Sequence, residues 1–190
     1  MSMKNLCVFC GSASGKARYA DVAKELGEEL AARGFGLVYG GAKVGLMGIV
    51  ADAARRGGAP TIGVIPGFLA GKEIAHEGLS ELHRVETMHQ RKALMADRAS
   101  AFVALPGGLG TLDELFEILT WAQLGLHTKP VVLLNAFGYF DALLAFLAHA
   151  ETEGLLRPEH RAALRVVQSP AAVLDIAESA GNSGPVTNVV

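Results

Sequence analysis

Three glycine-rich turns hold most of the residues in this sequence that could bind a ligand. They span Gly11–Gly15, Gly40–Gly48 and Pro106–Gly110, and each follows a short apolar run typical of a buried strand. Glycine lets the backbone turn sharply and approach a ligand closely. A helix that begins after such a turn offers free N–H groups and the positive end of its dipole, which attract phosphate. None of the turns has the Gly-x4-Gly-Lys-Ser/Thr pattern of the phosphate-binding loop. The turns therefore predict a nucleotide ligand but do not indicate which nucleotide.

The third turn continues into Pro106-Gly-Gly-Leu-Gly-Thr-Leu-Asp-Glu114, which allows two interpretations. Thr111 is followed three residues later by Glu114, which is the spacing of a capping box at a helix start. Capping, however, leaves the glycines that precede Thr111 unexplained. The alternative is that Glu114 is a catalytic carboxylate. The local sequence leaves both interpretations open.

A second polar segment, Met88-His-Gln-Arg-Lys92, lies at the start of an amphipathic stretch. Arg91 and Lys92 could form a solvated helix face, which is the commoner role of such a pair. They could also clamp an anion, with Arg91 forking onto a phosphate or a carboxylate.

Metal and redox chemistry have little support in the sequence. Cys7 and Cys10 form a Cys-x-x-Cys pair, but they fall in a predicted strand, where their odd spacing sends the side chains to opposite faces. No second pair completes a zinc site. The six histidines are scattered without the spacing of metal ligands. We therefore expect buried cysteines, no metal site and no cofactor.

Apolar runs alternate with amphipathic stretches along the chain. The predicted strands are Leu6–Cys10, Gly36–Tyr39, Thr61–Ile65, Leu82–Glu86, Ala101–Leu105, Pro130–Leu134 and Arg165–Val167. The predicted helices are Tyr19–Arg33, Leu46–Arg56, a short one within Phe68–Ser80, His89–Arg98, Thr111–Leu124, Phe140–Glu153, a turn near Pro158–Leu164, and Pro170–Ser179. This alternation predicts an α/β fold: a Rossmann-like, doubly wound domain whose mainly parallel sheet is flanked by helices. In such sheets ligands bind at the carboxyl ends of the strands, where the strand order reverses.

The composition limits the classes of function. The chain has 190 residues, 51% of them apolar, which suits one globular domain, here residues 1–180, followed by a loosely ordered tail at 181–190. A net charge of −2 and the absence of a basic run exclude a nucleic-acid partner. No apolar run approaches the ~20 residues that span a bilayer. No secretory signal is evident, so we expect a cytoplasmic protein without membrane contact.

The two polar segments together resemble the signature of a known enzyme family. Pro106-Gly-Gly-x-Gly-Thr-x-x-Glu114 and Met88-His-Gln-Arg-Lys92 are similar in type, order and spacing to the paired motifs of the Lonely-guy family, the cytokinin riboside 5′-monophosphate phosphoribohydrolases. Tyr39-Gly-Gly and Gly45-Leu-Met-Gly48 resemble the family's second glycine turn, and Cys10-Gly-Ser12 its first. The resemblance covers most of the chain.

This resemblance implies a hydrolase that cleaves the N-glycosidic bond of a nucleoside 5′-monophosphate, either a cytokinin riboside monophosphate or AMP. The products would be the free base and ribose 5-phosphate. It implies Glu114 and Arg91 as the catalytic residues and a homodimer as the assembled form. The substrate-binding positions that it implies are Glu73, Arg91, Lys92, Gly107, Gly108, Leu109, Gly110, Thr111, Leu112, Asp113, Glu114 and Thr120.

The ionisation of Glu114 bears on its role. Placed in the first turn of a helix, its carboxylate is expected to remain ionised, because the helix dipole favours an anion there by ~0.3–1 kcal/mol. An ionised carboxylate suits stabilisation of a positive charge or activation of water. The group that protonates the leaving base is not assigned, and the neighbouring Asp113 stays a candidate.

Two rival functions remain. The first is a carrier that holds a phosphorylated ligand without cleaving it, as in proteins that resemble molybdenum-cofactor carriers. A pure carrier would have no need of Arg91 and Glu114 together. The second is lysine decarboxylation, an old label for proteins with this glycine motif, but the sequence shows no lysine context typical of pyridoxal phosphate.

Overall fold

The computed structural model describes residues 4–70 and 74–180, whose strands form one seven-stranded sheet. Every pairing between neighbouring strands of this sheet is parallel. The spatial order is β4-β3-β2-β1-β5-β6-β7. The strands are β1 Asn5–Phe9, β2 Gly36–Tyr39, β3 Thr61–Pro66, β4 Glu81–Val85, β5 Ala101–Ala104, β6 Val131–Leu134 and β7 Leu164–Val167.

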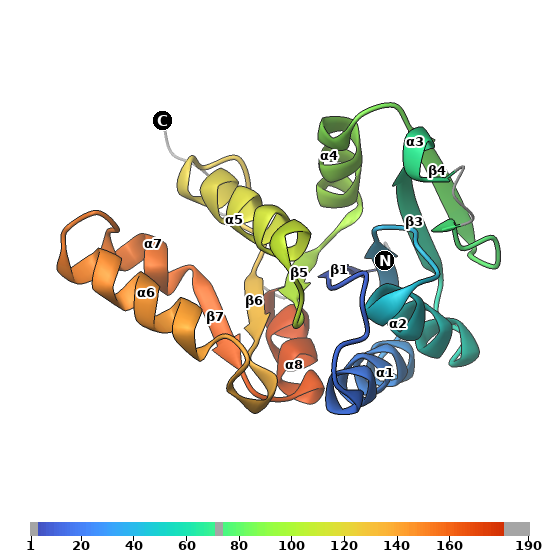
Figure 1. The fold of residues 1–190 in the computed structure, drawn as a ribbon, viewed down its shortest axis with the longest axis horizontal. Coiled ribbons are helices and arrows are strands. Elements are labelled where there is room, and N and C mark those ends of the chain that lie inside the picture. Colours follow the sequence, from blue (N-terminus) through green and yellow to red (C-terminus); the bar gives the residue numbers. More distant parts are fainter. Residues whose placement is uncertain (1–3, 71–73, 181–190) are drawn as a thin grey trace.

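Helices cover both faces of the sheet, as Figure 1 shows. On one face lie α1 (Ala17–Ala32), α2 (Gly45–Arg56) and α8 (Pro170–Ala180). On the other lie α4 (Met88–Arg98), α5 (Leu109–Gln123) and α6 (Asp141–Thr152). The shorter elements are α3 (Gly67–Leu69), the 3-10 helix η2 (Ala136–Gly138) and α7 (Pro158–Ala162). The predicted α/β, doubly wound fold is confirmed.

The central strand β1 shows why its sequence is almost entirely apolar. Leu6 and Val8 pack into the core beneath α1, α2 and α8, whereas Cys7 and Phe9 pack into the core on the α4–α5 face. Alternate side chains of a strand point to opposite faces, so a sheet covered on both sides needs apolar residues at every position. Cys10 joins the first core, opposite Cys7, and both thiols are free and buried, as predicted.

The strand order reverses between β1 and β5. From β1 the chain builds β2, β3 and β4 outward on one side, then returns to pair β5 with the other edge of β1. Phe9, at the end of β1, lies opposite Ala104, at the end of β5. The first and third glycine turns leave the sheet immediately after these two residues. The crevice that such a reversal creates is the usual ligand site of an open α/β sheet.

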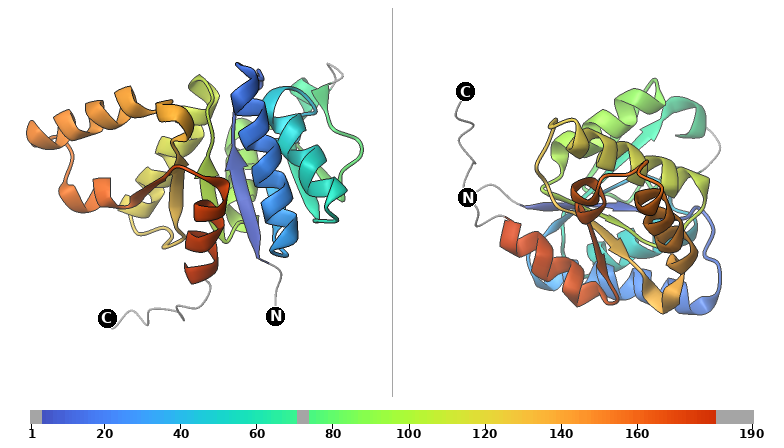
Figure 2. Two further views of the ribbon diagram at one scale, coloured as in Figure 1. Left: turned by 90° about the horizontal axis from the view of Figure 1, so that it is seen from below. Right: turned by 90° about the vertical axis from the view of Figure 1, so that its left-hand side faces the viewer.

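The last helix closes the α1 face. Figure 2 shows α8 alongside α1, and Arg33 at the end of α1 places Nη1 2.6 Å from Oδ1 of Asp175 on α8. Within residues 4–70 and 74–180, no helix is both long enough and apolar enough to cross a membrane.

The predicted elements differ from the observed ones in a few places. Helix α5 begins at Leu109 and not at Thr111, because Gly108 already acts as its N-cap. The short helix predicted within Phe68–Ser80 is α3, which begins one residue before that stretch, at Gly67, and ends at Leu69. The predicted tail at 181–190 falls outside the described residues.

Candidate active site

The three glycine turns meet at a single residue, Gly11. Its N–H donates to the carbonyl oxygen of Pro106 at 3.3 Å, and its own carbonyl oxygen accepts from the N–H of Leu46 at 3.1 Å. Turns separated by more than ninety residues in sequence are therefore joined directly after β1, β2 and β5. A cavity of about 250 Å³ opens beside them, lined by residues that include Gly40, Gly108 and Glu114.

The third turn requires glycine at position 107. A Cβ there would collide with the side chain of Thr111 and would lie 3.0 Å from the backbone nitrogen of Gly11. Because position 107 has no side chain, the third turn packs directly against the first.

The start of α5 presents free amides at this turn. The first N–H bonded inside the helix is that of Leu112, which donates to the carbonyl oxygen of Gly108 at 3.1 Å. The preceding amides of α5 have no acceptor within the helix. Such groups, at the positive end of the helix dipole, form a binding site for an anion.

A buried ion pair lies at the same cavity. Nη1 of Arg91 on α4 is 2.7 Å from Oε1 of Glu114 on α5. Only 8% of Arg91 and 7% of Glu114 is exposed to solvent. Two residues that the sequence places in separate motifs are thus brought into contact by the packing of α4 and α5 at the carboxyl edge of the sheet.

Arg91 is held by the way α4 begins. The Thr87 side chain accepts from the N–H of Gln90, and the Gln90 side chain accepts from the N–H of Thr87, which completes a capping box. Arg91 follows in the first turn, and its Nε donates to the carbonyl oxygen of Val64 in β3 at 3.1 Å. The guanidinium is therefore fixed at two points, with Glu114 as its charged partner.

The capping interpretation of Thr111 and Glu114 is wrong. The N-cap of α5 is Gly108, no side chain caps this helix, and the Glu114 carboxylate bonds Arg91 instead. Glu114 lies in the second turn of α5, which removes it from the strongest part of the helix dipole. The sequence contains a capping box, but it is the one that starts α4.

The environment shifts the ionisation of Glu114 in the direction opposite to that predicted from the dipole. Burial raises the pKa of its carboxyl group above the ordinary value, and the charge and hydrogen bond of Arg91 oppose that rise. Desolvation outweighs the attraction because the carboxyl group is almost entirely removed from water. A carboxyl group with a raised pKa is better able to exchange a proton near neutral pH.

Lys92 and Asp113 bind each other beside the central pair. Nζ of Lys92 is 2.7 Å from Oδ2 of Asp113 and 3.2 Å from Oε2 of Glu117. Partial burial lowers the pKa of Lys92, but its contacts with the two carboxylates outweigh this effect and raise the pKa. Lys92 therefore links α4 to α5 as a permanent cation.

The remaining predicted positions divide between the cavity and the outside. Leu109, Gly110 and Thr111 line the cavity with Gly108, whereas Leu112 packs into the α4–α5 core. The exposed Thr120 lies further along α5, outside the residues that line this cavity, and its hydroxyl donates to the carbonyl oxygen of Phe116 at 2.7 Å. Glu73 falls outside the described residues.

The substrate-binding positions predicted from the sequence omit six residues that line the cavity, although four of them lie in the first two glycine turns: Val8, Cys10, Gly11, Ser12, Gly40 and Met47. A Cβ on Gly40 would collide with Nη2 of Arg91 and lie 3.0 Å from Sδ of Met47. The Tyr39-Gly-Gly turn signalled that glycine was needed there, but not which side chain required the space.

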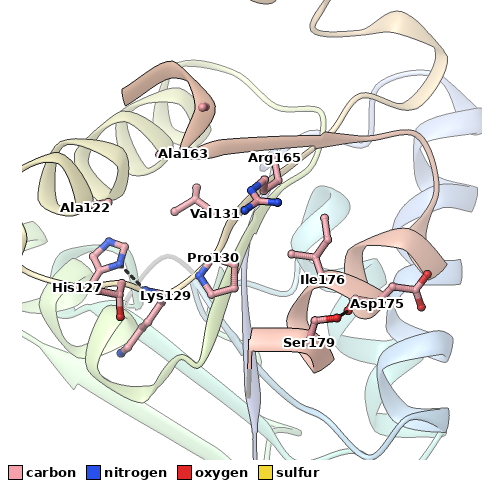
Figure 3. Close-up of a pocket in the computed structure, with 12 residues that line it drawn as sticks. Ala122, His127, Lys129, Pro130, Val131, Ala163, Arg165, Asp175, Ile176 and Ser179 are labelled. Atoms are coloured by element: carbon pink, nitrogen blue, oxygen red, sulfur yellow. Dashed lines mark hydrogen bonds between the residues drawn. The ribbon is translucent and has the colours of Figure 1, made fainter. Parts of the chain in front are cut away.

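A larger cavity of about 700 Å³, whose lining residues are drawn in Figure 3, lies at the opposite edge of the sheet. It opens beside Pro130 and Val131, at the amino end of β6. Two of its polar side chains are engaged in structural bonds: His127 bonds the carbonyl oxygen of Ile118 at 2.9 Å, and Lys129 donates to that of Ala96 at 2.8 Å. None of the three glycine turns reaches this cavity, so the smaller one is the better candidate site.

Within the described ranges, no group of three or more His, Cys, Asp or Glu residues is arranged to hold a metal ion.

Comparison with known proteins shows relatives that are similar in sequence over most of this chain. A family described as possible lysine decarboxylase matches residues 47–177. A probable cytokinin riboside 5′-monophosphate phosphoribohydrolase from Oryza sativa subsp. japonica is 58% identical over 159 residues, which cover 83% of this chain and 70% of the relative. The chain belongs to the Lonely-guy family. A second member of that family, a cytokinin riboside 5′-monophosphate phosphoribohydrolase from Arabidopsis thaliana, is 52% identical over 170 residues, covering 89% of this chain and 79% of the relative.

Solved structures of molybdenum-cofactor proteins share the fold. A molybdenum cofactor binding protein from Rippkaea orientalis superposes with a TM-score of 0.73 at 22% identity, over 94% of this chain and 98% of that one. The molybdenum cofactor carrier protein from Chlamydomonas reinhardtii gives 0.72 at 20% identity, over 96% and 100%. At this level of identity the likeness is one of fold alone.

Proposed function

We propose that this protein is a phosphoribohydrolase that cleaves the N-glycosidic bond of a cytokinin riboside 5′-monophosphate, or of AMP, to release the free base and ribose 5-phosphate. The observation that carries the proposal is the buried contact of Arg91 with Glu114 beside the free amides of α5. Relatives that are 50% or more identical bear the name of this activity.

The 5′-phosphate is held by the third glycine turn. Residues Gly108–Thr111 line the cavity at the start of α5, where unbonded amides and the helix dipole favour a dianion. The phosphate does not react, so its binding serves to orient the ribose toward Glu114.

Bond cleavage passes through an oxocarbenium-like state at the anomeric carbon. The bond from that carbon to the base nitrogen breaks, and its electron pair leaves with the base, which takes up a proton from the solvent. The oxygen of a water molecule attacks the same carbon, and Glu114 accepts the proton that the water loses. The Glu114 carboxylate also stabilises the positive charge on the sugar, while Arg91 fixes the orientation of the carboxylate.

Base release from matched substrates tests this function. We expect release from AMP and from a cytokinin riboside monophosphate, and little or none from the corresponding nucleosides, because the nucleosides lack the anchoring phosphate. Equal rates on nucleotide and nucleoside would contradict the role of the glycine turn.

A variant separates catalysis from structure. Glu114→Gln keeps the shape of the side chain and an acceptor for Arg91, so it should bind AMP, remain folded and lose turnover. The matched control is Glu117→Gln, one turn further along α5, which should stay active. Loss of helicity in Glu114→Gln would mean that residue 114 serves the fold and not the reaction.

The carrier function is the alternative that the shared fold suggests. A carrier needs the phosphate-binding amides but gains nothing from a carboxyl group with a raised pKa paired with a buried arginine. Binding of AMP without any release of adenine would favour the carrier.

Lysine decarboxylation agrees poorly with the site. A lysine that forms a Schiff base must lose its proton, and Lys92, the lysine next to Arg91, has a raised pKa because Asp113 and Glu117 surround it. Release of carbon dioxide from lysine is the direct assay, and we expect none.

We also propose that the protein acts as a homodimer in the cytoplasm, with residues 1–180 as its nucleotide-binding unit. The family resemblance assigns Thr120 to substrate binding, yet Thr120 is not among the residues that line the cavity of its own chain. Pairing of two copies through α5 would bring it to the other site. Leu124 and Leu126, both more than half exposed after α5, suit such a contact, and the free thiols suit a reducing compartment. Light scattering measures the molar mass in solution, and a mass equal to that of one chain would exclude the dimer.

A further inference from the structure

The third glycine turn accepts a hydrogen bond from a side chain in a distant part of the chain. The hydroxyl of Tyr139 donates to the carbonyl oxygen of Gly107 at 2.8 Å, across 32 residues of sequence. Tyr139 follows η2 in the connection from β6 to α6 and is absent from both family motifs. The bond therefore joins the neighbouring strand connection to the third glycine turn.

The bonded carbonyl belongs to the same peptide unit as the N–H of Gly108. No described peptide bond is cis, so this N–H points away from the carbonyl and hence away from Tyr139. Gly108 lines the cavity at the start of α5. A donor on the carbonyl oxygen polarises the peptide and strengthens its N–H as a donor on the other side.

Tyr139 is itself held in place. Its ring packs edge-on against Tyr19, with centroids 5.3 Å apart, and against Phe140, with centroids 4.8 Å apart. The N–H of Phe140 donates at 2.7 Å to the side chain of Asn135, which is buried at the end of β6. A continuous set of contacts thus runs from the sheet to the Tyr139 hydroxyl.

The backbone beside Tyr139 is strained in a way that fits this role. Phe137 has a φ of 57°, and no other non-glycine residue among those described has a positive φ. Such conformations cost free energy and persist where the surrounding structure imposes them. Here the strained turn lets the chain reverse from β6 and still direct Tyr139 toward Gly107.

We propose that Tyr139 is a positioning residue that orients and polarises the Gly107–Gly108 peptide, so that the Gly108 amide binds the 5′-phosphate of the substrate. The proposal rests on the proposed function for the identity of the ligand. It assigns to the β6–α6 connection a part in phosphate affinity, with no contact between Tyr139 and the reacting atoms.

Two matched variants test it, each removing one phenolic hydroxyl from the same aromatic group. Tyr139→Phe keeps the ring contacts and loses the bond to Gly107. Tyr19→Phe keeps the ring beside Tyr139 and loses a hydroxyl that accepts from Arg18 at 2.9 Å, with no contact to the turn. The probes are ribose 5-phosphate, titrated by calorimetry, and AMP and adenosine, assayed for adenine release.

For Tyr139→Phe we expect affinity for ribose 5-phosphate to fall about three- to tenfold, which is the effect of losing one hydrogen bond. The KM for AMP should rise by the same factor with kcat within about twofold, because the phosphate is bound equally in the ground and transition states. The rate of adenine release from adenosine should equal that of the wild type. Tyr19→Phe should match the wild type in every assay.

Three results would overturn the proposal. They are unchanged affinity for ribose 5-phosphate in Tyr139→Phe, an equal loss in Tyr19→Phe, and a loss in Tyr139→Phe that comes with a lower Tm, which would show a structural role only. Because the titration needs no turnover, it also separates this proposal from the function. A wild-type protein that binds ribose 5-phosphate through Tyr139 but releases no base would refute the function alone.

Discussion

The guanidinium of Arg91 occupies the space in which a side chain at position 40 would begin. Gly40 directly follows β2, and a Cβ built on it collides with Nη2 of Arg91. The contact between Arg91 and Glu114 therefore depends on a glycine of the second turn, which also lines the cavity. The second glycine turn serves the ion pair as well as the shape of the cavity.

Gly40→Ala is expected to lower kcat/KM about 100-fold, because displacement of catalytic groups by about 1 Å has effects of that size. Adenine release from AMP is the measurement. Gly67→Ala is the control: Gly67 follows the next strand, β3, and among the described residues a Cβ there would meet the carbonyl oxygen of Val85 alone, at 3.9 Å. Full activity in Gly40→Ala would show that the Arg91 side chain can contact Glu114 from another conformation.

Removal of one member of the buried pair should be costly. Arg91→Met leaves the Glu114 carboxylate buried without its cation, and we expect it to destabilise the protein by about 3–5 kcal/mol at neutral pH. In the double variant Arg91→Met/Glu114→Gln the charge is gone, so stability should recover in part, with a coupling of about 0.5–3 kcal/mol. Denaturant unfolding of four proteins, the wild type, each single variant and the double variant, measures the coupling. Strict additivity of the two substitutions would mean that the pair is not coupled.

The stability of the wild type relative to Glu114→Gln should depend on pH. Burial raises the pKa of Glu114 in the folded protein above its ordinary value of 4.5, so the folded state binds this proton more tightly than the unfolded state does. The wild type should therefore lose stability relative to the Gln variant as the pH rises from 4.5 through the folded pKa, and the difference should then level off. Unfolding curves from pH 4 to pH 8 give the comparison. A relative gain of the wild type over that range would mean that Arg91 outweighs burial.

Tyr39 offers a substitution that should stabilise the fold. Its hydroxyl is buried at the end of β2 and has no hydrogen-bond partner among the described residues. A buried hydroxyl without a partner costs about 1–3 kcal/mol, so Tyr39→Phe should raise the free energy of unfolding by about 1 kcal/mol. The control is Tyr19→Phe, which removes an exposed hydroxyl and should change the free energy of unfolding by less than about 0.5 kcal/mol. Destabilisation by Tyr39→Phe would reveal a partner for the hydroxyl.

Much of the fold follows from local patterns. The apolar runs that became β1, β2, β3, β5 and β6 are continuous because a sheet covered on both faces buries every side chain. The boundaries were less certain where two local signals compete. At α5, the Thr111–Glu114 spacing favours a later helix start. In the structure Gly108 is the N-cap, and the Glu114 carboxylate accepts a hydrogen bond from Arg91 instead. Local spacing cannot weigh a cap against a partner 23 residues away.

The sequence by itself determined the class of fold, the glycine turns and the two motifs, because strand and helix periodicity and backbone freedom are properties of neighbouring residues. Only the tertiary structure decided which of those residues meet. It placed Arg91 against Glu114, joined the three turns at Gly11, left Thr120 out of the cavity lining and brought Tyr139 to Gly107. The physical reason is that the order of parallel strands, and not distance along the chain, sets which turns lie side by side.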